Sequence, residues 1–242
     1  MNRSCIYYTN FGCVLLEGCK CMKERQLLLF SGGPDSTILL EFLLKQKNID
    51  LYVLFLRLAW NKEKEKKMQI QEKVAEKVIN YFKNEGHQFN YLTSGISIGL
   101  QKQGFGYDDQ WSAFLGSMIC HQLNIKKMWS GFYTYTYLNS VKIRGHGPDW
   151  IFDGSLKKYI RWGCSEDHKF ISEFQYLTPR KHFNGKEIDR FKSKKEAYLT
   201  LKPELREMTR SCYGTSYFCG TCYKCETLIK NKITDNKGNW IL

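Results

Sequence analysis

Long apolar runs and low-complexity stretches are both missing from this sequence of 242 residues. Its apolar segments, such as 27–30, fall far short of the roughly 20 residues that a membrane-spanning helix needs. No basic segment followed by an apolar stretch and a cleavage site opens the chain, so we expect a cytoplasmic protein without membrane partners. With 43% hydrophobic and 25% charged residues, the composition excludes disordered and collagen-like proteins and is typical of a soluble globular protein.

Acidic residues are scarce relative to basic ones, 24 against 37, which gives a formal net charge of +13. Net charge bears on partners rather than on the fold. The excess favours an anionic ligand or partner, such as a nucleotide, a nucleic acid or an acidic protein surface. A lysine-rich surface without such a partner is the alternative. The ten cysteines, in a chain without a secretion signal, indicate metal or redox chemistry before disulfides.

Strand-like and helix-like segments alternate along the chain. Apolar residues at helical spacing predict a long helix at 62–84, with Val78, Ile79 and Phe82 on its buried face. The other expected elements are strands at 26–30, 51–56, 89–92 and 127–131 and helices at 38–44, 111–122 and 187–201, the last broken by Pro203. This order predicts an α/β fold with a doubly wound parallel sheet covered by helices on both faces.

We divide the chain into three parts, without a linker that would separate two full domains. They are a cysteine-containing N-terminal extension (1–25), an α/β domain (26–205) and a C-terminal segment (206–242) with a small cysteine-rich subdomain. The aromatic stretch 132–180 is predicted to be irregular, and therefore either functional or mobile.

Residues 31–37, here called the glycine loop, join the first strand to the first helix. Gly32 and Gly33 let the backbone approach an anion, and the following helix offers free N–H groups and the positive end of its dipole. The hydroxyl groups of Ser31, Ser36 and Thr37 add donors. This is not a Walker A loop, because no Gly-Lys-Ser/Thr follows, and it is not a dinucleotide fingerprint. A turn that only joins two elements is the alternative.

The segment Ser31-Gly32-Gly33-Pro34-Asp35-Ser36 resembles the SGGxDS signature of the PP-loop ATP pyrophosphatases. The resemblance implies a Rossmann-like fold in which Ser31, Gly32, Gly33, Asp35, Ser36 and Thr37 bind ATP. It implies that AMP is attached to a carbonyl or carboxylate oxygen and is then displaced by a nitrogen or sulfur nucleophile. Asp35 would coordinate Mg²⁺ across the phosphates, since this hard cation prefers carboxylate oxygen.

Four cysteines near the C-terminus have the spacing C-x6-C-x2-C-x2-C: Cys212, Cys219, Cys222 and Cys225. The two-residue gaps let neighbouring thiolates converge on one ion, and four thiolates close a tetrahedral Zn²⁺ shell. A closed shell has no open position, so we expect a structural role. A redox pair or scattered thiols are the alternatives.

Ser211-Cys212-Tyr213 and Cys219-Gly220-x-Cys222-x-x-Cys225 resemble the C-terminal zinc motif of one PP-loop branch, the 7-cyano-7-deazaguanine synthases. The resemblance implies that 7-carboxy-7-deazaguanine is adenylated, aminated to the amide and dehydrated to the nitrile with a second ATP. It also implies that Asp149, after Gly147-Pro148, reads the base, and that Lys194 joins Asp35 and Ser36 in catalysis by neutralising phosphate charge. A turn residue and a solvated lysine are the alternatives for Asp149 and Lys194.

Several segments depart from that branch around the nucleobase and ammonia end of the site. Leu56–Trp60 and Asp109–Trp111 replace two of its segments, and Leu228 stands where it has an arginine. Nothing in it corresponds to residues 1–25. With these departures the chain resembles members of the branch from antiphage operons, which join the deazaguanine to a protein amine. The aromatic residues at 132–137, Trp150 and Trp162 are expected either to line a wider site or to pack in the core.

Other interpretations stay open. A PP-loop enzyme that modifies tRNA suits the charge, although nucleic acid is the less favoured partner, and a nucleic-acid-binding module with an inactive loop is a third hypothesis. The N-terminal cysteines, Cys5, Cys13, Cys19 and Cys21, have poor zinc spacing and can be buried thiols, a second metal site or reactive thiols. We keep a homodimer as an assembly to test.

Overall fold

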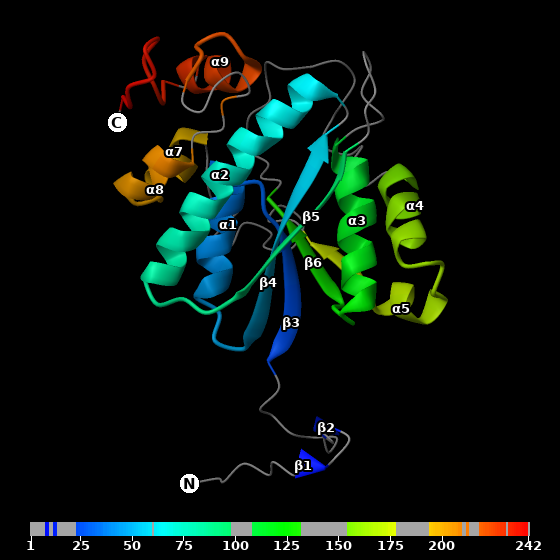
Figure 1. Ribbon diagram of the computed structural model, residues 1–242. Coiled ribbons are helices and arrows are strands. Elements are labelled where there is room, and N and C mark those ends of the chain that lie inside the picture. The colour runs from blue at the N-terminus through cyan, green and yellow to red at the C-terminus, as the bar shows by residue number, and fades with distance from the viewer. Residues whose placement is uncertain are drawn as a thin grey trace, which may run out of the picture.

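Five parallel strands form the central sheet of the computed structural model, in the order β5-β4-β3-β6-β7 (Figure 1). They are β3 (Glu24–Leu29), β4 (Ile49–Ala59), β5 (Asn90–Ser97), β6 (Lys127–Ser130) and β7 (Gln175–Leu177). Two short strands near the N-terminus, β1 (Tyr8–Thr9) and β2 (Gly12–Cys13), pair with each other and not with this sheet. The structure describes residues 8–9, 12–13, 23–59, 61–97, 108–131, 154–177, 194–209, 212, 218–230 and 232–241.

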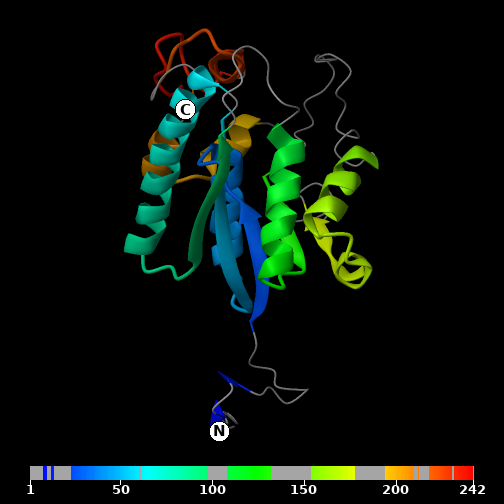
Figure 2. The same ribbon diagram turned by 45° about the vertical axis from the view of Figure 1, so that its right-hand side comes forward.

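Helices cover both faces of the sheet, so the predicted doubly wound α/β fold is confirmed (Figure 2). One face packs against α1 (Pro34–Leu44), α2 (Lys62–Asn84), α7 (Lys194–Leu199) and α8 (Pro203–Met208). The other packs against α3 (Asp108–Gln122), α4 (Gly154–Gly163) and α5 (His168–Glu173). Leu28 of β3 lies in the first core and its neighbour Leu27 in the second, as expected where successive side chains point to opposite faces of a sheet buried on both sides.

Local sequence explains where the main helices begin. The side chain of Asn61 accepts a hydrogen bond of 2.8 Å from the backbone N–H of Lys64 and caps α2, which coincides with the predicted helix. Pro34 and Pro203 each stand at the start of a helix, where proline has the required φ and its missing N–H costs nothing. Among the described residues, no helix is both long and apolar enough to cross a membrane.

Two predictions about secondary structure are wrong in part. The stretch 132–180 was expected to be irregular, but α4, α5 and β7 occupy most of 154–177. Of the helix expected at 187–201, residues 187–193 lie outside the described residues and α7 covers Lys194–Leu199; Pro203 opens a new helix, α8, instead of only ending the previous one. In both places the helices and strands are short and are stabilised by tertiary packing, which the periodicity of apolar residues in the sequence does not predict.

The C-terminal segment packs on the α/β core through α7. Tyr198 of α7 forms a small apolar cluster with Leu228 of α9 (Tyr223–Lys230), Ile233 and Trp240. The rings of Tyr198 and Trp240 have their centroids 5.9 Å apart. Leu228, which replaces the arginine of the deazaguanine branch, is therefore part of an apolar contact.

Candidate functional site

The glycine loop lies at the point where the strand order reverses. The chain leaves β3 to build β4 and β5 on one side, and β6 and β7 are then added on the other side of β3. In open α/β sheets the crevice outside the carboxyl ends of the strands at such a point is where ligands bind. The fold therefore places residues 31–37 at the usual ligand site of its class.

Hydroxyl groups hold the glycine loop in shape. The Ser36 hydroxyl donates to the carbonyl oxygen of Gly33 at 3.0 Å and lies 3.1 Å from the hydroxyl of Ser31. The Thr37 hydroxyl donates to the same carbonyl oxygen at 2.9 Å. Ser36 and Thr37 are buried while Ser31 is exposed, so the first two shape the loop from beneath and Ser31 faces solvent.

Gly32 is required by both conformation and space. Its φ is +73°, a region that residues with a Cβ rarely adopt. A Cβ built there would lie 2.9 Å from the backbone N and Cα of Ala75 in α2. The loop therefore rests directly on the backbone of α2, and any larger residue would push the two apart.

Gly131, which follows β6, packs closely against the start of α1. The first intrahelical hydrogen bond of α1 runs from the N–H of Thr37 to the carbonyl oxygen of Gly33 at 3.0 Å, so the N–H groups of Asp35 and Ser36 precede it. A Cβ at residue 131 would lie 3.0 Å from the backbone N of Ser36. The absence of that Cβ lets the end of β6 approach the first turn of α1 closely, at the positive end of the helix dipole where anions bind.

A pair of hydrogen-bonded hydroxyl groups, of which that of Ser130 belongs to a buried residue, lies at the carboxyl ends of β6 and β7. Tyr176 donates a hydrogen bond of 2.9 Å to the hydroxyl oxygen of Ser130, which is 4% exposed. Ser130 is paired in register with Leu29, two residues before Ser31. Sequence analysis missed Ser130, Gly131 and Tyr176, although a Ser-Gly pair at the end of the strand expected at 127–131 was a usable signal.

Asp35 occupies the first turn of α1. It is half-buried, and its charge reaches Tyr198 of α7: burial and the Asp35 carboxylate together raise the pKa of Tyr198 well above its usual value. The site thus brings together the predicted ATP residues, Ser31, Gly32, Gly33, Asp35, Ser36 and Thr37, and adds Tyr198, which the sequence did not reveal.

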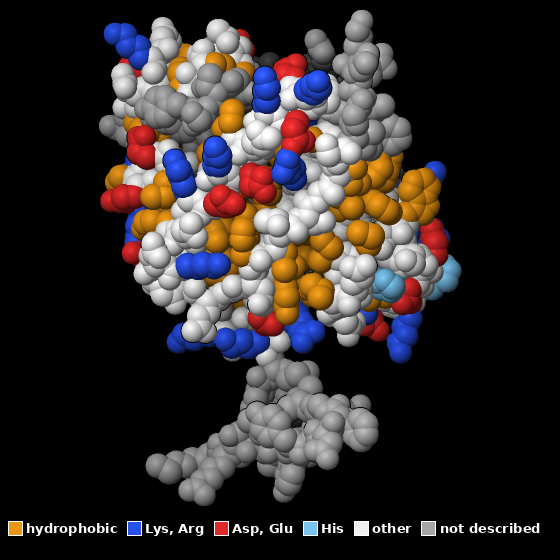
Figure 3. Space-filling view, viewed as in Figure 1, with side chains coloured by type: hydrophobic (Ala, Val, Ile, Leu, Met, Phe, Trp, Pro, Cys, Tyr) orange, Lys and Arg blue, Asp and Glu red, His pale blue; other side chains and the backbone are white. Residues whose placement is uncertain are grey.

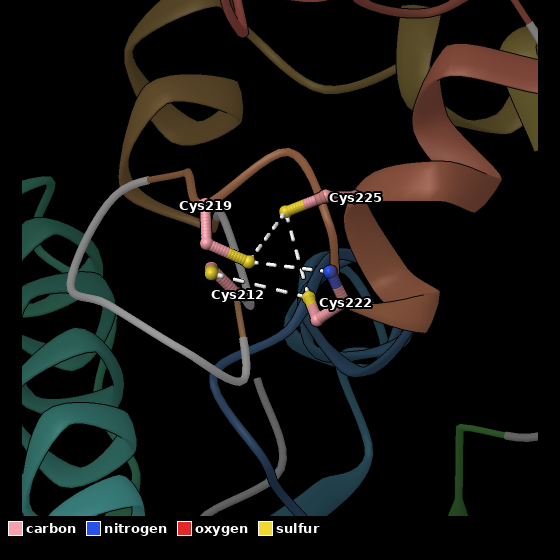
Figure 4. A group of neighbouring side chains, drawn as sticks. All are labelled: Cys212, Cys219, Cys222 and Cys225. Carbon is pink, nitrogen blue, oxygen red and sulfur yellow. Dashed lines mark hydrogen bonds between the residues drawn. The ribbon is translucent and has the colours of Figure 1, made fainter.

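The four C-terminal cysteines converge with their sulfur atoms pointing toward one another (Figure 4). The Sγ–Sγ distances are 4.0 Å for Cys212–Cys222, 4.0 Å for Cys219–Cys225 and 3.5 Å for Cys222–Cys225. Four thiolates about 2.3 Å from a tetrahedral Zn²⁺ would be ~3.8 Å apart. The set therefore fits a single metal ion of this size, and a cubane cluster would spread the thiolates farther apart because each would bind a different iron atom.

Local structure prepares Cys219 to be a thiolate. Hydrogen bonds from the backbone and the side chain of Thr221, with a further one from the backbone N–H of Cys222, lower the pKa of Cys219 to about 6. Burial raises the pKa of Cys225 to about 12 in the absence of a cation. A bound metal ion supplies the positive charge that deprotonates such a thiol.

Several predicted residues fall elsewhere. Asp149, Trp150, the aromatic residues at 132–137 and the N-terminal Cys5, Cys19 and Cys21 lie outside the described residues, as do the side chains of Cys13 and Lys194. Lys194 is the first residue of α7. Trp162 is 47% exposed on α4, with the ammonium group of Lys158 4.7 Å from its ring centre, so it is not a core residue.

Two further cysteines are packed in the core. Cys120 of α3 and Cys164 after α4 are both buried. Burial raises the pKa of both thiols, that of Cys164 to about 11. They are therefore poor nucleophiles near neutral pH.

Comparison with known proteins assigns neither a family nor a function to this chain. No protein-family model matches the chain, and no curated protein matches it. Among solved structures, the U34-tRNA thiolase NcsA from Methanococcus maripaludis, with its [4Fe-4S] cluster, is similar at 16% sequence identity and a TM-score of 0.42. The similarity covers 88% of this chain and 70% of that chain. It is too low to assign a substrate or a cofactor.

Proposed function

We propose that the chain is an ATP-dependent, AMP-forming ligase whose glycine loop binds the pyrophosphate end of ATP. The observation that carries the proposal is the position of the glycine loop, which leads into the N-terminus of α1 at the switch point of a doubly wound sheet. The match of residues 31–36 to the SGGxDS signature supports ATP over other phosphate ligands.

The glycine loop contains a carboxylate and no lysine, which implies a divalent cation. A phosphate chain beside Asp35 would be repelled unless a cation lay between them. Mg²⁺ binds through one or two carboxylates together with substrate phosphates, so Asp35 would hold it across the bound triphosphate. The Ser31 hydroxyl and the amides of the first turn would take the remaining phosphate oxygens.

The reaction follows from that placement. The carboxylate oxygen of the substrate attacks the α-phosphorus of ATP and forms an acyl adenylate, and the bond to pyrophosphate breaks. A nitrogen nucleophile then attacks the acyl carbon, AMP leaves with the electron pair, and the amide forms. The chain contributes mainly by holding the two reactants in line and by stabilising the charge on the leaving pyrophosphate.

The proposed acid is 7-carboxy-7-deazaguanine, and the proposed acceptor is ammonia, as in the 7-cyano-7-deazaguanine synthases. The order and spacing of the two motifs, at 31–36 and 211–225, support this assignment. Transfer to a protein amine is the alternative, because the chain departs from that branch at 56–60 and 109–111.

The test incubates the protein with Mg²⁺, ATP and 7-carboxy-7-deazaguanine, with and without ammonia, and measures AMP and pyrophosphate by chromatography. AMP formation that depends on the acid is the expected result. An adenylate that accumulates and does not react with added ammonia would favour the protein acceptor. Asp35→Ala should abolish AMP formation, while Glu41→Ala on the same helix should not. Unchanged turnover by Asp35→Ala would remove this carboxylate from the mechanism.

The four cysteines are proposed to hold one structural Zn²⁺. The Sγ–Sγ distances support a single tetrahedral ion. Metal analysis of protein purified without added metal should give one zinc per chain and no iron. Stoichiometric iron and inorganic sulfide would contradict the assignment.

A nucleic-acid substrate is a second candidate, favoured by one face of α2. Lys62, Lys66, Lys73 and Lys77 recur at spacings that keep them on one side of the helix, and all four are exposed without an ion pair among the described residues. Figure 3 shows acidic side chains between the basic ones over this helix. Two glutamates of α2, Glu65 and Glu72, form ion pairs with Arg57 of β4, so part of the acidic charge on this helix is neutralised.

Charge reversal on that face separates the two candidates. If the protein binds nucleic acid, the logarithm of its binding constant should fall with the logarithm of the salt concentration with a slope of several units. The double substitution Lys66→Glu with Lys73→Glu should make this slope smaller. AMP formation from a free acid that is unaffected by the double variant and by added tRNA would leave the small-molecule ligase as the function.

A further inference from the structure

The described chain contains a continuous packed connection between the four-cysteine cluster and the glycine loop. Cys225 and Leu228 lie three residues apart on α9, hence on one side of that helix. Leu228 packs against Tyr198 of α7, and α7 contacts α1, the helix that follows the glycine loop.

A second connection reaches the same tyrosine from the other end of the cysteine motif. Phe218, which precedes Cys219, lies against the backbone of Gly238, where a Cβ would be 2.7 Å from its ring. The segment 233–241 closes on itself through a bridge between Thr234 and Trp240. Trp240 then packs on the Tyr198 ring.

The other side of α7 is fixed to the nucleotide-binding helix. Ala197 and Leu201 belong to the same core as Ile38 and Leu39 of α1, and α7 contacts α1 directly. Tyr198 is 4% exposed, so the ring fills the space between α1 and the C-terminal segment with little room to move. A change in the position of α9 must therefore be transmitted to the start of α1 or leave a cavity.

We infer that Tyr198 is a positioning residue that couples metal binding at the four cysteines to ATP binding at the glycine loop. The inference rests on the proposed function, since it takes ATP as the ligand of the loop. With Zn²⁺ bound, α9 holds Leu228 against Tyr198, and α7 in turn packs on α1 through Ala197 and Leu201, so that the helix that follows the glycine loop keeps its position. Without the metal, α9 loses its anchor and this support is lost.

Coupling between two sites is reciprocal. If Zn²⁺ strengthens ATP binding by a given factor, then ATP must strengthen Zn²⁺ binding by the same factor. Two binding sites with a demonstrated coupling usually change each other by about 5- to 150-fold. This gives a measurement that needs no turnover: the rate at which zinc leaves the protein, with and without nucleotide.

The experiment uses the full-length, zinc-loaded protein and a chromogenic chelator that reports released zinc. Saturating Mg²⁺ with a non-hydrolysable ATP analogue should slow zinc release at least about fivefold. Zinc-free protein should bind the analogue more weakly by a similar factor, measured by calorimetry.

Three variants locate the coupling. Tyr198→Leu should bring the ratio of the two release rates close to one, and Tyr198→Phe, which keeps the ring against Trp240, should restore it. Phe170→Leu changes another aromatic residue that is 4% exposed, in α5 on the opposite face of the sheet, and should keep the wild-type ratio. If Tyr198→Leu does not fold, Trp240→Leu removes the ring contact from the outer side and should reduce the ratio instead.

The outcomes separate this inference from the proposed function. Analogue binding without any slowing of zinc release in the wild-type protein would overturn the coupling and leave the ATP site standing. A full effect in Tyr198→Leu would remove Tyr198 from the connection. Failure of the wild-type protein to bind the analogue at all would overturn both proposals.

Discussion

Replacing Gly32 with alanine is expected to damage the fold and the glycine loop together. The substituted residue would have to adopt a φ of +73°. For a residue with a Cβ, a left-handed conformation costs about 1–2 kcal/mol. In addition, the new Cβ would lie 2.9 Å from the backbone of Ala75 in α2, and overpacking of this kind costs about 1–3 kcal/mol. The two contributions predict a loss of about 2–5 kcal/mol.

Gly86 offers a matched control for the conformational contribution. It has a φ of +86° at the end of α2, and a Cβ there would meet nothing within 4 Å. Gly86→Ala should therefore cost only the conformational part, about 1–2 kcal/mol. The difference between the two variants isolates the contact between the loop and α2.

Equilibrium unfolding in urea measures both variants, since a loss of stability appears as a lower midpoint at unchanged slope. Removing the methyl group of Ala75 should not rescue Gly32→Ala, because the nearest atoms in α2 belong to the backbone. Equal midpoint shifts for Gly32→Ala and Gly86→Ala would refute the close packing of the loop on α2.

Three further changes test other parts of the structure. Gly131→Ala would place a Cβ 3.0 Å from the backbone N of Ser36, so the start of α1 would have to shift: ATP affinity measured by calorimetry should fall about tenfold, and the unfolding midpoint should fall as well, because overpacking of this kind costs about 1–3 kcal/mol. Burial acts to raise the pKa of Glu24, but hydrogen bonds, first of all the one from Lys127, outweigh it and lower this pKa in the folded protein. The ionised Glu24 therefore stabilises the fold at pH values above its unfolded-state pKa, and this stabilisation is lost as the pH falls through the folded-state pKa. Glu24→Gln should make the free energy of unfolding depend less on pH in the acid range, and an unchanged dependence would contradict this. Cys222→Ser should lower zinc content and folded yield together, because the binding energy of structural zinc is folding energy; a metal-free variant of full stability would argue against the structural role.

The elements with strong local signals could be predicted from the sequence. The helix expected at 62–84 coincides with α2, because its apolar stripe is long and its Asn61 cap is local. The glycine loop was also placed correctly between a strand and a helix. The strands β4 and β5 extend beyond their predicted ranges because pairing along the sheet continues past the apolar run.

The parts of the site that depend on distant segments could not be predicted. Gly131 matters only because β6 pairs beside β3, and Tyr198 matters only because α7 packs between α1 and the C-terminal segment. Neither residue belongs to a local motif. The cysteine cluster was predictable because its ligands lie close together in the sequence, so that spacing alone brings them near one another.

The central position of β3 has a consequence for biosynthesis. The strand that leads into the glycine loop pairs with β4 on one side and with β6, about a hundred residues later, on the other. A nascent chain on the ribosome therefore has the loop sequence long before it has Gly131 to complete the crevice. If the glycine loop binds a triphosphate as proposed, the polypeptide gains this ability only after residue 131 has been translated, and a fragment that ends before β6 should bind none.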